Sequence, residues 1–295
     1  MPNLKEVRER IVSVKSTQQI TSAMKMVSAS KLRRAQNAIL KLRPYAAKLK
    51  EILINVSSNL DNIEENTFSI ERSPEKVLLI VITSNRGLCG GFNSNIIKAT
   101  NLLINNQYAS QLKKGNLSLI TIGKKASEYY KKRSYQVIES HNDWIDSPSF
   151  DKIAPVVEKI MIEYSKGAYD RIEIVYNQFK NAVNQVLVNE LFLPIVSVVP
   201  KDATKKKLKT DFIYEPDKQE IIKELIPKSL KIQFYKSILD SIASEQGARM
   251  TAMHQATENA SEIIKGLNLA YNKARQAAIT KEILEIVSGA EALKQ

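Results

Sequence analysis

The chain has few of the residues that build metal sites and nucleophilic catalysis. Cys89 is its only cysteine, and His141 and His254 are its only histidines. One cysteine excludes a disulfide within the chain and a metal site made of several cysteines. Two histidines far apart in the sequence argue against a histidine-based metal centre and against a Ser-His or Cys-His catalytic pair. No resident cofactor or metal is therefore expected.

Long apolar runs are lacking as well. The longest uninterrupted aliphatic run extends from Val77 to Ile82, whereas a membrane-spanning helix needs about 20 apolar residues. The amino terminus is basic but has no apolar stretch of the kind that directs secretion, and Glu6 and Glu9 argue against a transit peptide. The expectation is a cytoplasmic chain that is soluble or attached peripherally to a membrane.

A heptad spacing occupies both ends of the sequence. Between Leu4 and Leu60, thirteen of seventeen positions on a three-four spacing are apolar, and the spacing recurs between Leu239 and Leu284 with three polar interruptions. A repeat of this length keeps one seam facing a partner helix. The two ends are therefore predicted to form one antiparallel coiled coil, with helices on the order of 80 to 100 Å long. The principal seam positions are Leu4, Val7, Ile11, Val14, Ile263 and Leu267.

Two irregularities interrupt the amino-terminal repeat. Pro44 lies inside it and removes a backbone donor, which predicts a kink or a local break near Arg43. Between residues 18 and 28 the seam positions are polar, and the apolar residues, Met24 and Val27 among them, shift around the helix. In this stretch the helix is expected to face a different partner.

Positive charge is concentrated in the first helix. The chain carries a net charge of +13, and residues 1–50 contain twelve lysines and arginines against only Glu6 and Glu9. A basic helix can bind nucleic acid phosphates, acidic lipid or an acidic protein surface. A merely solvated face would show mixed signs. An acidic partner is therefore expected for the first helix.

The middle of the chain has a different pattern. β-rich runs alternate with helical patterns, which predicts a Rossmann-like parallel sheet, and two further runs without intervening helices predict that the sheet ends in antiparallel strands. The fold class is thus an α/β domain combined with a long coiled coil. The predicted strands are 77–83, 117–123, 171–179, 185–195 and 211–214, and the helices lie near 95–112, 124–132 and 153–165. The predicted domains are an amino-terminal helix (1–65), the α/β domain (75–215) and a carboxyl-terminal helix (217–295).

The glycine-rich stretch TSNRGLCGGFN directly follows the first predicted strand. Such strand-to-helix loops can hold phosphate on backbone N–H groups. The spacing of Gly87, Gly90 and Gly91 matches neither the dinucleotide fingerprint nor the Walker loop, and no lysine follows Gly91. A tight turn that needs a positive φ is the favoured interpretation, so no nucleotide site is predicted. Arg86 remains a candidate contact in an exposed loop.

Polar side chains and alanines alternate near the carboxyl end. Arg275, Gln276, Thr280 and Glu282 lie among alanines, which gives a slim helix suited to a narrow sleeve and a few specific contacts without a bulky apolar anchor. An alanine-rich helix of high intrinsic propensity would look the same. Composition alone does not choose between these interpretations.

Several motifs together resemble the gamma subunit of the F-type ATP synthase. They are QQITSAMKMVSASKLRRAQ with the following RPYA, then TSNRGLCGGFN, then YEPD, and finally ASEQGARMTAM and YNKARQAAITKEILEIVSGAEAL. The resemblance covers essentially the whole chain. Agreement at several motifs in the same order makes it specific.

The resemblance implies a non-catalytic subunit and not an enzyme. Such a subunit is the central rotating stalk that mechanically couples proton flow through the membrane ring to ATP synthesis or hydrolysis in the ring of alpha and beta subunits. Its implied partners are the alpha, beta and epsilon subunits and the membrane c-ring, with one copy per complex, no homo-oligomer and no nucleic acid. The chain lacks the inserted cysteine pair of the chloroplast form, so a bacterial enzyme on the cytoplasmic face of the inner membrane is implied.

The resemblance also implies roles for particular residues. Met24 and Lys25 match the segment that faces an acidic loop of beta. Tyr214 and Glu215 match the foot that meets the membrane ring and epsilon. The remaining matches to beta contacts are Arg249, Arg275, Gln276, Thr280 and Glu282.

Two other classes remain open at this point. A coiled-coil nucleic-acid-binding protein would use the basic first helix on phosphates, and its binding would weaken steeply with salt. The aromatic residues that a single-strand binder interleaves with its basic residues are missing from residues 1–44. A nucleotide-binding enzyme would use the glycine loop, against which the missing lysine argues.

Overall fold

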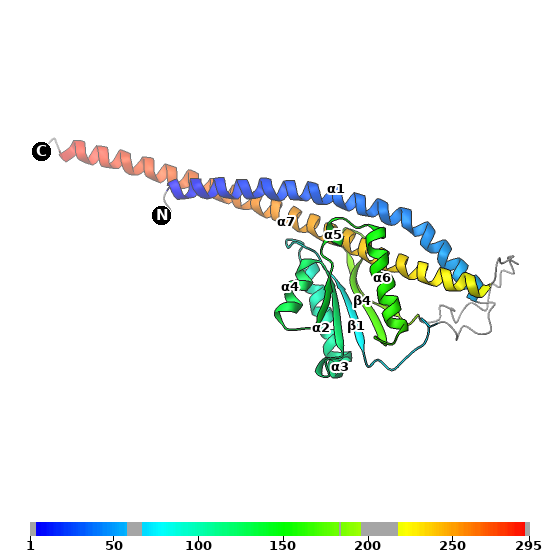
Figure 1. Ribbon diagram of the computed structural model, residues 1–295. Coiled ribbons are helices and arrows are strands. Elements are labelled where there is room, and N and C mark those ends of the chain that lie inside the picture. The colour runs from blue at the N-terminus through cyan, green and yellow to red at the C-terminus, as the bar shows by residue number, and fades with distance from the viewer. Residues whose placement is uncertain (1–3, 58–66, 183, 196–217, 293–295) are drawn as a thin grey trace. The chain divides into compact units, whose positions relative to one another are not determined.

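The structure is a computed structural model that describes residues 4–57, 67–182, 184–195 and 218–292 (Figure 1). Two long helices, α1 (Leu4–Ser57) and α7 (Lys218–Ala292), enclose a central α/β region in the sequence. The chain divides into two compact units. The coiled-coil unit contains residues 1–29 and 249–295, and the sheet unit contains residues 30–248.

In the coiled-coil unit, α1 packs on α7 along the predicted seam. Each three-four position from Leu4 to Ser28 is buried or half-buried, and most intervening positions are exposed. Burial of this narrow stripe is the packing that a heptad repeat specifies. The prediction of an antiparallel coiled coil is therefore confirmed.

One predicted seam position on α7 is wrong. Ile263 is 50% exposed, whereas Ile264 is half-buried. The predicted and observed repeats share Met253, Ala260 and Leu267. Between Ala260 and Leu267, a heptad repeat can place either of two adjacent residues, Ile263 or Ile264, on the seam. The structure uses the later one, because α7 turns that side of the helix toward α1.

The polar section of the seam is stabilised by side-chain hydrogen bonds. Thr21 is buried, and its hydroxyl accepts a hydrogen bond from the Thr257 hydroxyl at 2.9 Å. Ser28 is buried on the same seam. Ile20 and Val27 instead lie outside, 60% and 56% exposed. Polar groups thus join the helices here, while apolar side chains face outward.

The carboxyl end of α7 extends past the start of α1 (Figure 1). Residues 279–290, which we call the exposed tip, are all exposed to solvent although they are helical. A single helix without a partner can bury none of its faces. The exposed tip therefore has no packing from this chain.

The sheet unit is built on a five-stranded sheet in the order β3-β2-β1-β4-β5. The first four strands are parallel, and β5 is antiparallel to β4, as predicted. All residues of β1 and β2 are buried, as expected for parallel strands covered on both faces. The strands are β1 (Val77–Ile82), β2 (Leu117–Ile122), β3 (Val137–Ser140), β4 (Arg171–Phe179) and β5 (Gln185–Leu193).

Helices cover both faces of the sheet (Figure 1). One face packs against α2 and α4, whose Ile96, Ala126 and Tyr130 belong to a buried cluster with Leu79. On the other face, α7 contributes Phe234, which is fully buried and lies edge-on to Trp144 and Phe192. The helices are α2 (Phe92–Gln107), α3 (Ala109–Lys113), α4 (Lys124–Lys132), α5 (Asp143–Asp146) and α6 (Phe150–Ser165).

Two features of this unit differ from the predictions. Of the kink or local break predicted near Arg43, the break does not occur, because α1 continues through Pro44 from Leu4 to Ser57. The carbonyl that loses its partner belongs to Leu40, four residues earlier, and Leu40 is 58% exposed, so water can replace the missing donor. The short edge strand β3 and the helix α5 were not predicted from the sequence.

The β4–β5 hairpin rests directly on α7. A Cβ at Gly247 would lie 3.3 Å from both the Cα and the carbonyl oxygen of Ala182 and 3.5 Å from the Phe179 ring. Nearby, the Ser244 hydroxyl donates to the Asn177 carbonyl at 2.9 Å. The backbone of the hairpin thus approaches the helix where a side chain is missing. The strand predicted at 211–214 lies outside the described residues.

Candidate functional site

The first helix presents its basic residues to solvent. Apolar residues of α1 such as Val7 occupy the seam, and Arg8, Arg10 and Lys15 occupy exposed positions on the remaining surface. Lys5 is also exposed. This face concentrates positive charge without burying it, which favours association with an acidic surface.

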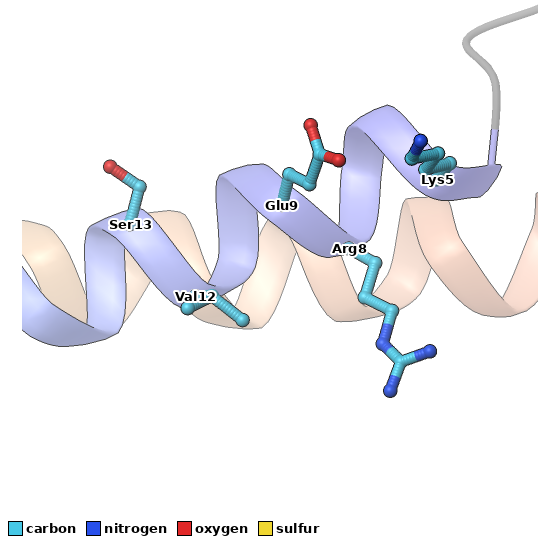
Figure 2. A pocket seen from close by; sticks show the side chains of 5 residues that line it. All are labelled: Lys5, Arg8, Glu9, Val12 and Ser13. Atoms are coloured by element: carbon cyan, nitrogen blue, oxygen red, sulfur yellow. The ribbon is translucent and has the colours of Figure 1, made fainter.

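A shallow hollow of about 460 Å³ lies on the outer side of the first turns of α1 (Figure 2). Its lining residues project outward from this one helix. Two cationic side chains on a convex helix suit a loop of another protein better than an enclosed small molecule. The lining residues are Lys5, Arg8, Glu9, Val12 and Ser13.

Met24 and Lys25 lie in the polar section of the coiled coil, and both are half-exposed. The Lys25 ammonium lies 3.2 Å from Nδ1 of His254 on α7. The outward-facing Ile20 and Val27 belong to the same stretch of α1. The structure therefore combines a cation and apolar side chains on one accessible stretch.

The polar residues predicted near the carboxyl end are exposed. Arg275 and Gln276 lie a few residues before the exposed tip, and Thr280 and Glu282 lie within it. The Thr280 hydroxyl donates to the Gln276 carbonyl at 2.9 Å, a bond within the helix that leaves the Gln276 amide available. These four side chains have the accessibility that a contact with another subunit needs.

The prediction that the carboxyl end lacks a bulky apolar anchor is wrong. Ile279, Ile283 and Ile286 are 50%, 55% and 71% exposed, and Leu284 and Val287 are exposed beside them. The i, i+4, i+7 spacing of the three isoleucines predicts an apolar stripe on one helix side. Exposed apolar patches of this kind mark interaction sites. The three isoleucines were present in the sequence but received no role, and of these residues only Leu284 was placed on the predicted coiled-coil seam.

Arg249 differs from the other predicted contacts. Its side chain is only 8% exposed, so this chain already covers most of it. Tyr214 and Glu215, predicted for the foot, lie outside the described residues. Of the predicted contacts, the structure therefore leaves accessible those at Met24, Lys25 and near the carboxyl end.

The glycine loop after β1 is a tight turn fixed by side-chain hydrogen bonds. Gly90 has a φ of 58°, which confirms that the turn needs a positive φ there. The Asn93 carboxamide oxygen accepts from the Ser84 backbone N–H at 3.0 Å, and Asn85 donates to Asp146 at 2.8 Å. Arg86 is exposed at the outer part of this turn.

A second glycine closes the same end of the sheet. Gly123, after β2, has a φ of 98°, and a Cβ there would lie 2.2 Å from the Thr83 carbonyl oxygen. The Thr83 hydroxyl accepts from the Ala126 backbone N–H at 2.9 Å, which occupies a donor at the start of α4. The residue directly after β1 therefore packs against the start of α4 and occupies a backbone donor there.

Within the described part of the chain, no group of three or more His, Cys, Asp or Glu side chains could hold a metal ion. Among the same residues, no helix is both long and apolar enough to cross a membrane.

These features define a class of protein, a subunit in which an antiparallel two-helix coiled coil carries an α/β unit of Rossmann-like topology. A family model described as ATP synthase matches residues 3–293. The ATP synthase gamma chain of Cytophaga hutchinsonii is 53% identical, with 99% of each chain covered. That of Flavobacterium psychrophilum is 52% identical over the full length of both chains. The chain belongs to the ATP synthase gamma family.

Solved structures agree with this assignment. The central stalk and c-ring structure of the Tetrahymena thermophila mitochondrial ATP synthase contains a chain 25% identical to this one, with a TM-score of 0.58 over 80% of this chain and 99% of that one. The rotor of the Euglena gracilis enzyme matches in fold, with 22% identity, a TM-score of 0.64 and coverage of 94% and 98%. The matches favour a stalk subunit over the nucleic-acid-binding and nucleotide-binding alternatives.

Proposed function

We propose that this chain is the central rotating stalk subunit of an F-type ATP synthase. It would couple proton flow through the membrane c-ring to ATP synthesis or hydrolysis in the alpha/beta ring, without catalytic residues of its own. The observation that carries this proposal is the helical exposed tip with its outward isoleucines, in a chain that matches ATP synthase gamma chains along its length. Bulky apolar residues in water at the end of a stable rod indicate a surface that another protein covers.

The mechanism follows from asymmetry. One stalk inside a three-fold ring presents a different side to each catalytic subunit. At any rotational position of the stalk, the three catalytic subunits are therefore biased toward different conformations. By thermodynamic reciprocity, nucleotide binding in the ring biases the angle of the stalk, and rotation of the stalk changes nucleotide affinity. The chain needs only a stiff rod and direction-dependent surface contacts for this role.

Three surfaces of the chain would make these contacts. The exposed tip and the adjoining Arg275 and Gln276 would touch the beta subunits near the top of the ring. Met24 and Lys25, half-exposed and beside outward apolar residues, would face an acidic beta loop. Tyr214 and Glu215 would meet the c-ring and epsilon. The chain would lie at the cytoplasmic face of the bacterial inner membrane as a peripheral subunit.

Reconstitution tests the proposal. Purified alpha and beta subunits of the same complex are mixed with and without this chain at fixed salt, and complex size and ATP hydrolysis are measured. We expect one larger complex with a single copy of this chain and a much higher multi-site turnover. No association, together with salt-dependent binding of DNA by the chain, would instead support the nucleic-acid alternative.

A further inference from the structure

The contact between Lys25 and His254 determines which ring nitrogen of a neutral His254 carries the proton. A lysine ammonium has donors and no acceptor, and its Nζ lies 3.2 Å from His254 Nδ1. Nδ1 must therefore accept, so the ring proton of the neutral imidazole is on Nε2. Nε2 in turn lies 3.4 Å from Glu258 Oε1, which places a carboxylate beside the nitrogen that carries the proton. Lysine, histidine and glutamate thus form one chain of contacts from α1 to α7.

We propose that His254 is a positioning residue for Lys25, and that its neutral form directs the Lys25 ammonium toward α7 and away from free solvent. The inference rests on the proposed function, in which Lys25 contacts an acidic surface of the ring. It adds a residue on the opposite helix that determines where this charge is held.

The neighbouring packing brings the two groups together. Thr21 and Thr257 are hydrogen-bonded at 2.9 Å, about one turn away from Lys25 and His254 on their respective helices. This bond fixes the register of α1 against α7 at the position where the ammonium meets the ring. A lysine side chain is otherwise highly flexible, so the acceptor on α7 selects one position from many.

Protonation of His254 would remove this acceptor. An imidazolium donates from both nitrogens, so an Nδ1–H would point at the Lys25 ammonium and the contact would be lost. Among the described residues, the charged groups that contact the ring are Lys25 from α1 and Glu258 from α7. The positioning role therefore belongs to the neutral ring alone.

Two uncharged substitutions of His254 distinguish the loss of the Lys25 acceptor from a general change in side-chain size. In His254→Asn the carboxamide lies near the former Nδ1 position and can still accept from Lys25. In His254→Gln the longer side chain places its carboxamide near the former Nε2 position, away from Lys25. His254 is about half-exposed, with 49% of its side-chain surface accessible, so both variants are expected to fold.

The first test uses the full-length chain alone, by ¹⁵N NMR of its imidazoles at pH 8. The chain has only two histidines, so the His254→Asn spectrum assigns both. We expect the Nε2–H tautomer to predominate at His254, and a mixture of tautomers in Lys25→Met. An Nδ1–H tautomer, or no change in Lys25→Met, would overturn the positioning role whatever the function of the chain.

The second test uses the complex with alpha and beta at pH 8. We expect His254→Asn to keep multi-site ATP hydrolysis within about twofold of the parent, and His254→Gln to change it about threefold, the scale of one exposed charge contact. Equal behaviour of the two variants overturns the inference. Failure of every form to assemble overturns the proposed function, and the NMR result then decides the inference alone.

Discussion

Two stretches of α7 show opposite burial within one uninterrupted helix. Residues 237–247 are all buried, whereas residues 279–290 are all exposed. The buried stretch includes Asp240 and Ser244, and the exposed one includes Ile283 and Ile286. Polar residues are usually outside and large apolar residues inside, so these four residues depart from the usual distribution. The first stretch is packed by this chain, whereas the second receives no packing from it.

The largest difference between the two stretches should appear in stability. Phe234→Ala removes a fully buried ring between Trp144 and Phe192 and should lower the free energy of unfolding of the sheet unit by about 3 to 5 kcal/mol. Ile283→Ala in the exposed tip should change it by less than about 0.5 kcal/mol. Urea unfolding of both variants measures the difference. Similar losses in the two variants would show that the tip is packed by this chain after all.

Asp240 lies in the buried stretch, and its substitution should raise the stability of the chain instead of lowering it. Burial raises the pKa of this carboxyl from 3.8 to about 6, against the attraction of Lys236 and Arg43. Because the folded state then binds the proton more tightly than the unfolded state, this group contributes less stability as the pH rises from about 4 to 6. The ionised carboxylate therefore costs stability above pH 6, by at most about 3 kcal/mol.

Asp240→Asn should accordingly stabilise the chain at pH 8 by about 1 to 3 kcal/mol, and the gain should vanish near pH 4, where the parent carboxyl is protonated as well. Unfolding of parent and variant at a series of pH values gives this difference directly. Glu158→Gln is the matched control, since Glu158 is 55% exposed in its ion pair with Lys231, and it should show a change below about 0.5 kcal/mol. A stability difference that did not depend on pH would contradict the assignment to ionisation.

Arg275 tests the tip end of α7 in the assembled enzyme. Arg275→Ala should leave the unfolding of the isolated chain unchanged, because the residue is exposed, and should reduce ATP-driven proton pumping by about tenfold, as expected for one arginine at an interface hot spot. Lys273→Ala, a nearby exposed cation, is the control and should have a smaller effect. Pumping and thermal unfolding are measured on the same preparations. Loss of the isolated fold in Arg275→Ala would return this residue to a structural role.

The smallest effect concerns the polar section of the coiled coil. Thr257→Val removes the donor to Thr21 and should destabilise the coiled-coil unit by about 1 kcal/mol. Thr17→Val removes a hydroxyl that bonds only within α1, to the Ser13 carbonyl at 3.0 Å, and should cost less. Hydrogen exchange of α1 amides compares the two variants. Equal exchange would show that the threonine pair does not join the helices.

Elements with a clear pattern of apolar residues could be predicted from the sequence. Elements whose formation depends on contacts with distant parts of the chain could not. The continuous apolar run of β1, the largely apolar β2 and the heptads of α1 could be recognised because both faces or one seam must be buried. The edge strand β3 has no such run, since its residues are only half-buried or exposed. The shift from Ile263 to Ile264 escaped for a different reason, because a heptad admits either neighbour.

The candidate contacts were predictable to a similar degree. Exposure of Arg275 and Thr280 followed from their polarity. The burial of Arg249 and the exposure of Ile286 did not, since burial on α7 depends on which of its residues α1 covers. That relation becomes visible only when the two helices are paired in space. The contact between Lys25 and His254 likewise joins residues 229 positions apart.

Gly247 gives the junction between the hairpin and α7 a mechanical property. The Ala182 backbone lies 3.3 Å from where a Cβ at Gly247 would be, so main chain faces main chain across this contact. Side chains yield under load by changing rotamer, but two backbones pressed together have no such freedom. A torque applied to the sheet should therefore be transmitted to this part of α7 through a rigid contact, with little elastic deformation at the junction.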